Sequence, residues 1–89
     1  MEWAIQFSRK ARQQLENLDP QVARRIFRYL FERVARSPNP RSLGEALKGT
    51  DLGDLWRYRV GDFRVVCHIQ DGVMTVLVLQ VGNRREVYR

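Results

Sequence analysis

Apolar and polar side chains alternate along two stretches of this chain, 55–60 and 63–69, which a two-residue turn joins. The turn is Gly61-Asp62, and a glycine in its first position fits a type II′ hairpin that pairs Val60 with Phe63. Successive side chains of a strand point to opposite faces, so the pattern predicts a hairpin with one apolar face. That face holds Trp56, Tyr58, Val60, Phe63, Val65, Cys67 and Ile69.

The opposite face of the hairpin, which we call the arginine face, carries Arg57, Arg59, Arg64 and His68. The predicted register sets Arg59 directly opposite Arg64, with Arg57 beside them. Like charges that face each other across strands destabilise a sheet. This cluster is tolerable if an anionic ligand is meant to lie on it, so the pattern predicts an anion-binding surface.

The residues before the hairpin predict one strand and two helices. Alternation of Trp3, Ile5 and Phe7 with polar or small residues predicts the strand, and Ser8 is a plausible N-cap for a helix over 9–18. Asp19-Pro20 is a strong start signal for a second helix, which the Ser-Pro-Asn-Pro run at 37–40 ends. The second helix has a broad apolar stripe: Val22, Ala23, Ile26, Phe27, Leu30, Phe31 and Val34.

The residues after the hairpin predict a further strand. Asp71-Gly72 is a type I′ turn signal between 68–70 and 73–75, and Gly82-Asn83 is expected to end the strand. In that register Met74, Val76 and Val78 join the apolar face. Thr75, Leu77 and Leu79 fall on the arginine face, with Leu79 beside Arg64.

The fold class predicted from these elements is α+β, in the order β-α-α-β-β-β, as a single domain over residues 1–89. The helical hairpin covers the apolar face of an antiparallel sheet, and the arginine face is expected to stay open and basic.

Composition supports an anionic partner. The 89 residues carry a formal charge of +6 and a sequence pI of about 10.4, and Lys10 and Lys48 are the only lysines among 16 basic residues. Cys67 is the single cysteine, which excludes a disulfide framework and a cysteine-rich metal site. We expect no signal peptide, no membrane span and a cytoplasmic protein.

Two motifs together resemble RelE-type toxins of the RelE/ParE toxin–antitoxin superfamily. They are Arg-Val-Gly-Asp-Phe-Arg at 59–64 and Val-Gly-Asn-Arg-Arg-Glu-Val-Tyr at 81–88, with Leu-Lys-Gly at 47–49. The resemblance covers essentially the whole chain. It implies a toxin that enters the ribosomal A site, contacts 16S rRNA and cuts mRNA without a metal or small-molecule cofactor. It also implies a cognate antitoxin that blocks the toxin.

The resemblance carries roles to individual positions. Arg64 matches an arginine that contacts the phosphate at the cut, Arg84 one that stabilises or protonates the leaving group, and Tyr88 a tyrosine that positions the nucleotide. Arg57 falls where some members have a lysine implicated as a base, but Leu55 replaces a second such lysine. Lys48, Arg59 and Arg85 are expected to bind RNA.

Arginine stays protonated at physiological pH, so the general base is left open among Glu86, Tyr88, Lys48 and a ribosomal group. His68 lies toward the far end of its strand, which argues against catalysis. Two alternatives stay open: a ParE-like inhibitor of DNA gyrase and a non-catalytic basic RNA-binding relative.

Overall fold

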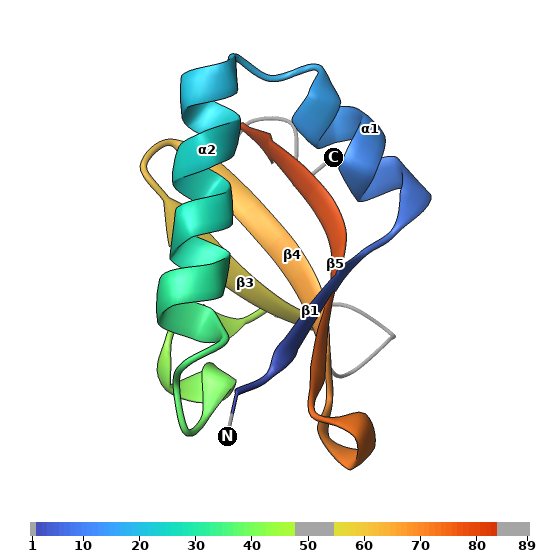
Figure 1. Cartoon of the computed structure of the whole chain (residues 1–89), viewed down its shortest axis with the longest axis vertical. Helices are drawn as coiled ribbons and strands as arrows, with labels where there is room; N and C mark the ends of the chain where they lie inside the picture. Colours follow the sequence, from blue (N-terminus) through green and yellow to red (C-terminus); the bar gives the residue numbers. More distant parts are fainter. Residues whose placement is uncertain (1, 48–54, 84–89) are drawn as a thin grey trace.

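The computed structural model describes residues 2–47 and 55–83, which form a sheet with two helices packed on one of its faces (Figure 1). Within these residues the sheet has five strands in the order β1-β5-β4-β3-β2. The strands are β1 (Ala4–Phe7), β2 (Glu45–Ala46), β3 (Leu55–Val60), β4 (Phe63–Gln70) and β5 (Thr75–Asn83). The predicted α+β class, with a helical pair covering one sheet face, is confirmed.

The hairpin of β3 and β4 has the predicted register. Val60 pairs with Phe63 and Arg59 pairs with Arg64. A type II′ turn requires a positive φ at its first central residue and not at its second. Gly61 has a φ of +60°, and Asp62 does not adopt a positive φ. A glycine is needed here because other L residues reach this backbone region only with strain.

Both predicted helix starts are confirmed. Ser8 caps α1 (Arg9–Glu16) by accepting a hydrogen bond from the Ala11 amide, and Asp19 caps α2 (Pro20–Arg28) by accepting one from the Gln21 amide. The first helix ends two residues earlier than predicted. The second continues through a π-helical turn, Tyr29–Val34, in which the Ala35 amide donates to the Leu30 carbonyl.

The core lies between these helices and the predicted apolar face of the sheet. Tyr58, Val65 and Cys67 are fully buried there against Ile26, Leu30 and Val34 from the second helical segment. Phe27 and Phe31 of the same stripe stay 38% and 46% exposed and cluster with Phe7. The stripe is therefore wider than the sheet surface that it covers.

Two features of the sheet correct the prediction. First, β1 pairs with β5 in parallel, so the sheet is mixed rather than wholly antiparallel. After β1 the chain passes through the two helices and joins the sheet again at its opposite edge, as β2. The later strands then follow one another back across the sheet, so that β5 lies beside β1. Second, the loop before the hairpin contributes β2, which pairs with β3 and is too short to show an alternating pattern.

The connection from β4 to β5 also differs from the prediction. Asp71–Val73 form a 3-10 turn that Met74 closes with a φ of +44°, so no type I′ turn forms and Met74 lies outside the strand. Val76 and Val78 are buried in the core as predicted.

Farther along β5, a bulge leaves Leu79 without a cross-strand partner and places Gly82, not Leu79, opposite Arg64. Backbone groups at the bulge form hydrogen bonds with α1 and its N-cap. The Ser8 hydroxyl donates to the Leu79 carbonyl, and the Gln14 amide oxygen accepts from the Val81 amide. Gly82 and Asn83, which were expected to break the strand, are part of β5 and pair with Arg64 and Phe63.

Candidate nucleic-acid interface

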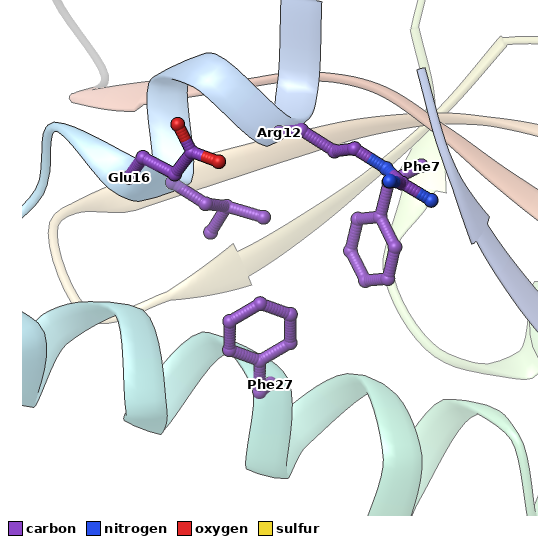
Figure 2. A pocket seen from close by; sticks show the side chains of 5 residues that line it. Phe7, Arg12, Glu16 and Phe27 are labelled. Atoms are coloured by element: carbon purple, nitrogen blue, oxygen red, sulfur yellow. The ribbon is translucent and has the colours of Figure 1, made fainter. Parts of the chain in front are cut away.

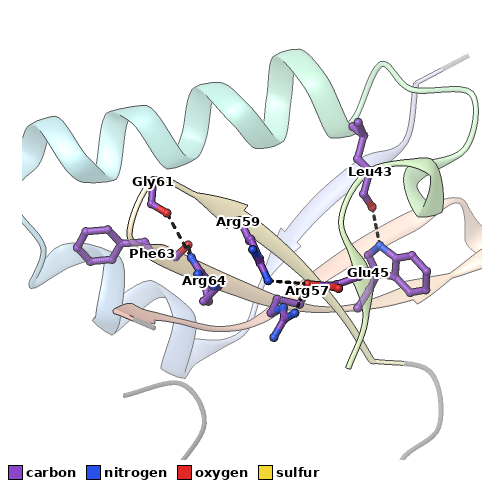
Figure 3. A network of polar contacts seen from close by, with 8 residues as sticks. Leu43, Glu45, Arg57, Arg59, Gly61, Phe63 and Arg64 are labelled. Atoms are coloured by element: carbon purple, nitrogen blue, oxygen red, sulfur yellow. Dashed lines mark hydrogen bonds and ion pairs between the residues drawn. The ribbon is translucent and has the colours of Figure 1, made fainter. Parts of the chain in front are cut away.

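Arg64 is held within the arginine face rather than projecting from it. Its residue surface is only 8% exposed, and its Nη1 donates to the carbonyls of Gly61 at 3.2 Å and Phe63 at 3.1 Å (Figure 3). The hairpin turn therefore fixes the direction of this guanidinium. The expectation of an open face is wrong at this position, because the guanidinium lies against the carbonyls of the hairpin turn.

Arg57 and Arg59 converge on one carboxylate, that of Glu45 in β2 (Figure 3). The Arg57 side chain is 16% exposed and donates through Nη2 to Glu45 Oε1. The Arg59 side chain is 61% exposed and reaches the same oxygen at 3.1 Å. The hydrogen bond from Arg57 is the main reason that the pKa of Glu45 lies below its ordinary value.

Glu45 is the residue of this face that the sequence pattern missed. Its strand has two residues, and no periodicity marks it. The signal that could have found it is the glycine before it. Gly44 has a φ of +72°, and a Cβ there would lie 2.3 Å from the Arg57 carbonyl oxygen. Only glycine allows this close approach, which brings the Glu45 carboxylate to the arginines.

The loop that carries Glu45 is fastened to β3 by two aromatic side chains. The indole Nε1 of Trp56 donates to the Leu43 carbonyl at 2.6 Å, and the Tyr58 hydroxyl donates to the Pro40 carbonyl at 2.8 Å. Both aromatic residues belong to the apolar face, so the core positions the carboxylate on the opposite face.

His68 and Leu55 are cross-strand partners at the end of the hairpin away from the turn. His68 is partly exposed, and Leu77 faces it from β5. His68 was expected to lie away from Arg84 and Tyr88, and these two residues lie outside the described part of the chain. Leu55 brings an aliphatic side chain to the position where some members of the resembled family carry lysine.

Of the predicted site residues, the structure brings together Arg57, Arg59 and Arg64. The others, Lys48, Arg84, Arg85 and Tyr88, lie outside the described residues, as does Glu86. Within the described part of the chain, no group of three or more histidine, cysteine, aspartate or glutamate side chains could hold a metal ion.

A different kind of cavity lies in the helical layer, on the other side of the sheet from the arginine face. Phe7 and Leu15 line it together with Phe27, and Arg12 and Glu16 stand at its polar side (Figure 2). The rest of the lining is aromatic and aliphatic, and Glu16 balances the charge of Arg12, so this cavity lacks the net positive charge that would attract a phosphate. No helix of residues 2–47 and 55–83 has the length and hydropathy to cross a bilayer.

Comparison with known proteins identifies the family. The family model described as "ParE toxin of type II toxin-antitoxin system, parDE" matches residues 5–88. The chain belongs to this toxin family. The predicted membership of the RelE/ParE superfamily is thereby confirmed, and the protein is a toxin of a type II toxin–antitoxin system.

The similar curated toxins carry RelE-type names. The chain is 28% identical to Toxin RelG of Mycobacterium tuberculosis over 89 residues, which is 100% of this chain and 99% of that protein. It is 33% identical to Toxin RelE of the same organism over 79 residues, covering 89% of this chain and 78% of that protein.

Among solved structures, the toxin resembles a chain of the toxin–antitoxin complex RelBE2 from Mycobacterium tuberculosis. The TM-score is 0.84 at 26% identity, and the match covers 94% of this chain and 100% of that chain. The described fold is therefore that of a RelE-type toxin.

Proposed function

We propose that this toxin is a ribosome-dependent endonuclease that cuts mRNA in the A site by attack of the neighbouring 2′-hydroxyl. The observation that carries the proposal is the fixed guanidinium of Arg64, set beside Arg59 on a face with Arg57 and Glu45. The similar curated toxins carry RelE-type names and so support it, because the RelE-type resemblance implies this reaction.

The reaction requires a proton acceptor, a proton donor and positive charge close to the phosphate. The 2′-oxygen forms a bond to phosphorus while the bond from phosphorus to the 5′-oxygen breaks. A base accepts the 2′-hydroxyl proton, and an acid gives a proton to the departing 5′-oxygen. Arg64 and Arg57 supply positive charge to the phosphate, and preorganised donors of this kind are worth about 3–4 kcal/mol of barrier each.

Glu45 is the proton acceptor that we assign to this face. Its side chain is 50% exposed and lies against Arg57, so its carboxylate is accessible to the RNA. The carboxylate is ionised at neutral pH, and the hydrogen bond from Arg57 lowers its pKa and so makes it a weaker base than a free glutamate. An ionised carboxylate can accept the 2′-hydroxyl proton, which the arginines cannot do. This role compensates for the aliphatic side chain at Leu55.

The remaining site residues enter the proposal through the family resemblance. Arg84 stabilises or protonates the leaving group, and Tyr88 positions the reacting nucleotide. Lys48, Arg59 and Arg85 bind the RNA backbone. A cognate antitoxin completes the proposal: the similar toxin structure is part of a toxin–antitoxin complex, and we expect an acidic and apolar antitoxin segment to cover the arginine face or displace the end of the chain.

One alternative has an observation in its favour. The matching family model is named for ParE, and a ParE-like toxin would inhibit DNA gyrase without cutting RNA. A non-catalytic RNA-binding relative is the remaining alternative. The two alternatives predict no new RNA ends.

The decisive experiment adds the purified toxin to translating ribosomes and maps mRNA 5′ ends by primer extension. We expect cuts inside A-site codons, and a loss of about 100-fold or more in Arg64→Gln. Arg36→Gln is the control, since that exposed arginine pairs only with Glu2 in the described chain. Thermal unfolding verifies that each variant is folded.

Absence of cuts from the folded toxin would refute the nuclease proposal. A parallel gyrase supercoiling assay then distinguishes the ParE-like alternative. If folded Arg64→Gln still cuts mRNA at the wild-type rate, the nuclease proposal stands but Arg64 is not part of the catalytic site.

A further inference from the structure

A second basic concavity lies between the second helical segment and the β3–β4 turn. We call it the arginine groove and define it by Arg25, Arg28, Arg33 and Arg59. Its volume is about 510 Å³, and Glu32 is the single carboxylate among its lining residues. Four guanidinium groups around one cavity give it a strongly positive potential.

Three of the four groove arginines form no ion pair with a carboxylate of the described residues. Arg36 and Arg41 each form an ion pair with a carboxylate, and Arg59 pairs with Glu45. Arg25, Arg28 and Arg33 form no such pair with any carboxylate of residues 2–47 and 55–83. Their positive charge is therefore available to a ligand.

A purely structural reason explains only part of this cluster. Arg33 lies in the last turn of the helical segment that continues α2, where the helix dipole favours cations, but Arg25 and Arg28 lie before the end of that segment. Arg25 and Arg28 also repel each other at a spacing of three positions. The dipole of α2 also gives no reason for Arg59, which the sheet brings to the groove from β3.

The groove is continuous with the arginine face. A Cβ on Gly61 would lie 3.0 Å from Arg25 Nη1, so this guanidinium lies against the hairpin turn. The carbonyl of the same Gly61 accepts from Arg64 Nη1 on the other side. Arg59 lines the groove and also contacts Glu45. One anionic strand can therefore contact both surfaces around the turn.

We propose that the arginine groove binds backbone phosphates of structured RNA, as a second contact that holds the toxin on its RNA partner. Arginine makes paired hydrogen bonds to phosphate oxygens, and the Arg33 guanidinium, 5.9 Å from the Tyr29 ring centroid, is steadied by that ring. An acidic protein segment fits less well, because protein interfaces concentrate apolar anchors at their centre, and this groove is lined mainly by charged side chains.

This inference rests on the proposed function only for the identity of the RNA, so its test measures binding rather than cleavage. Purified small ribosomal subunits are titrated with the full-length toxin at several salt concentrations. The variant is Arg25→Gln/Arg28→Gln. The matched control is Arg9→Gln/Lys10→Gln, which removes the same charge from two exposed positions of α1.

We expect the groove variant to bind at least tenfold more weakly at low salt. The slope of log affinity against log salt should fall by about 1.5–2, the change for two lost phosphate contacts. The control should lose less than half of that slope. Equal losses in the two variants, or wild-type affinity in the groove variant, would overturn the proposal. So would unchanged RNA affinity with weakened binding of an acidic peptide.

Cleavage and binding can fail separately. If the toxin cuts mRNA but its groove variant binds like wild type, the proposed function is supported and the proposed role of the groove is refuted. If the toxin binds subunits through the groove but does not cut mRNA, the proposed role of the groove is supported and the nuclease proposal is refuted.

Discussion

The free energy of unfolding of this toxin depends on alkaline pH through two buried titratable side chains, Tyr58 and Cys67. Both are fully buried, and burial raises the pKa of the Cys67 thiol above its ordinary value of 9.0. Burial is also the main reason that the pKa of Tyr58 lies above 10.0. Both groups therefore stay protonated in the folded state at a pH where the unfolded chain ionises.

The sign of the resulting pH dependence follows from linkage. The stability from these groups is complete below pH 9, falls once the unfolded thiol ionises, and continues to fall toward the raised folded pKa values. Each group contributes a slope that approaches about 1.4 kcal/mol per pH unit. We predict that Cys67→Ala has a flatter stability curve than wild type between pH 9 and pH 10, measured by urea unfolding. Parallel curves would contradict the assignment to Cys67.

At the scale of elements, the short strand β2 depends on its preceding glycine. Gly44 combines a positive φ with contact distances that no other side chain fits, 2.3 Å to the Arg57 carbonyl oxygen and 2.8 Å to Tyr58 Cδ1. A larger residue must move the loop away from β3 and carry Glu45 with it. The site carboxylate is therefore as sensitive to this glycine as to its own identity.

We predict that Gly44→Ala lowers the free energy of unfolding by at least about 2 kcal/mol, because strain and steric overlap add. Gly72→Ala is the matched control, since a Cβ there meets nothing within 4 Å and its φ is not positive. Chemical denaturation of both variants measures the difference. Similar stabilities for the two variants would show that β2 can shift without cost.

At the scale of the whole molecule, basic side chains lie on both layers. Arg57, Arg59 and Arg64 belong to the sheet, whereas the groove arginines Arg25, Arg28 and Arg33 belong to the helical layer, which also exposes the cluster of Phe7, Phe27 and Phe31. Glu45 partly neutralises the arginine face. Its removal would raise the formal charge of the chain from +6 by one and take away the carboxylate that Arg57 and Arg59 share.

Glu45→Gln should therefore separate binding from chemistry. We predict tighter binding to small ribosomal subunits, with a salt slope steeper by up to about 1, because the arginines no longer share a carboxylate. Cleavage should fall by about 100-fold or more, as expected on removal of a general base. Asp71→Asn is the control, because it removes the same charge from the exposed pair with Arg41.

A different result for this pair of variants would be informative about the base. If Glu45→Gln cuts mRNA as fast as wild type while it binds more tightly, Glu45 only neutralises charge. The base then lies elsewhere on the toxin or the ribosome. If both variants bind more tightly by the same factor, the gain comes from net charge and not from the arginine face.

Local signals were sufficient for several parts of the fold. The hairpin register, with Arg59 opposite Arg64, follows from the alternation of side chains and from a glycine in the first position of a two-residue turn. The helix starts at Ser8 and Asp19 follow from capping chemistry within three residues of each position. These predictions hold because the groups that decide them are neighbours along the chain.

Other features needed partners far apart in the sequence. The bulge at Leu79 is stabilised by Ser8 and Gln14 of α1, and Glu45 reaches Arg57 only because Gly44 lets two segments approach. No short window of sequence contains both sides of these contacts.

The sequence by itself determined the class of the fold, the faces of the hairpin and the family of the toxin, because periodicity, turn chemistry and motifs are local properties. The tertiary structure decided which side chains share a site. It buried Arg64 against the hairpin turn, set Glu45 between two arginines and opened the groove beside α2. The physical reason is that strand order, close backbone approach and charge pairing depend on distances in space, which the order of residues does not fix.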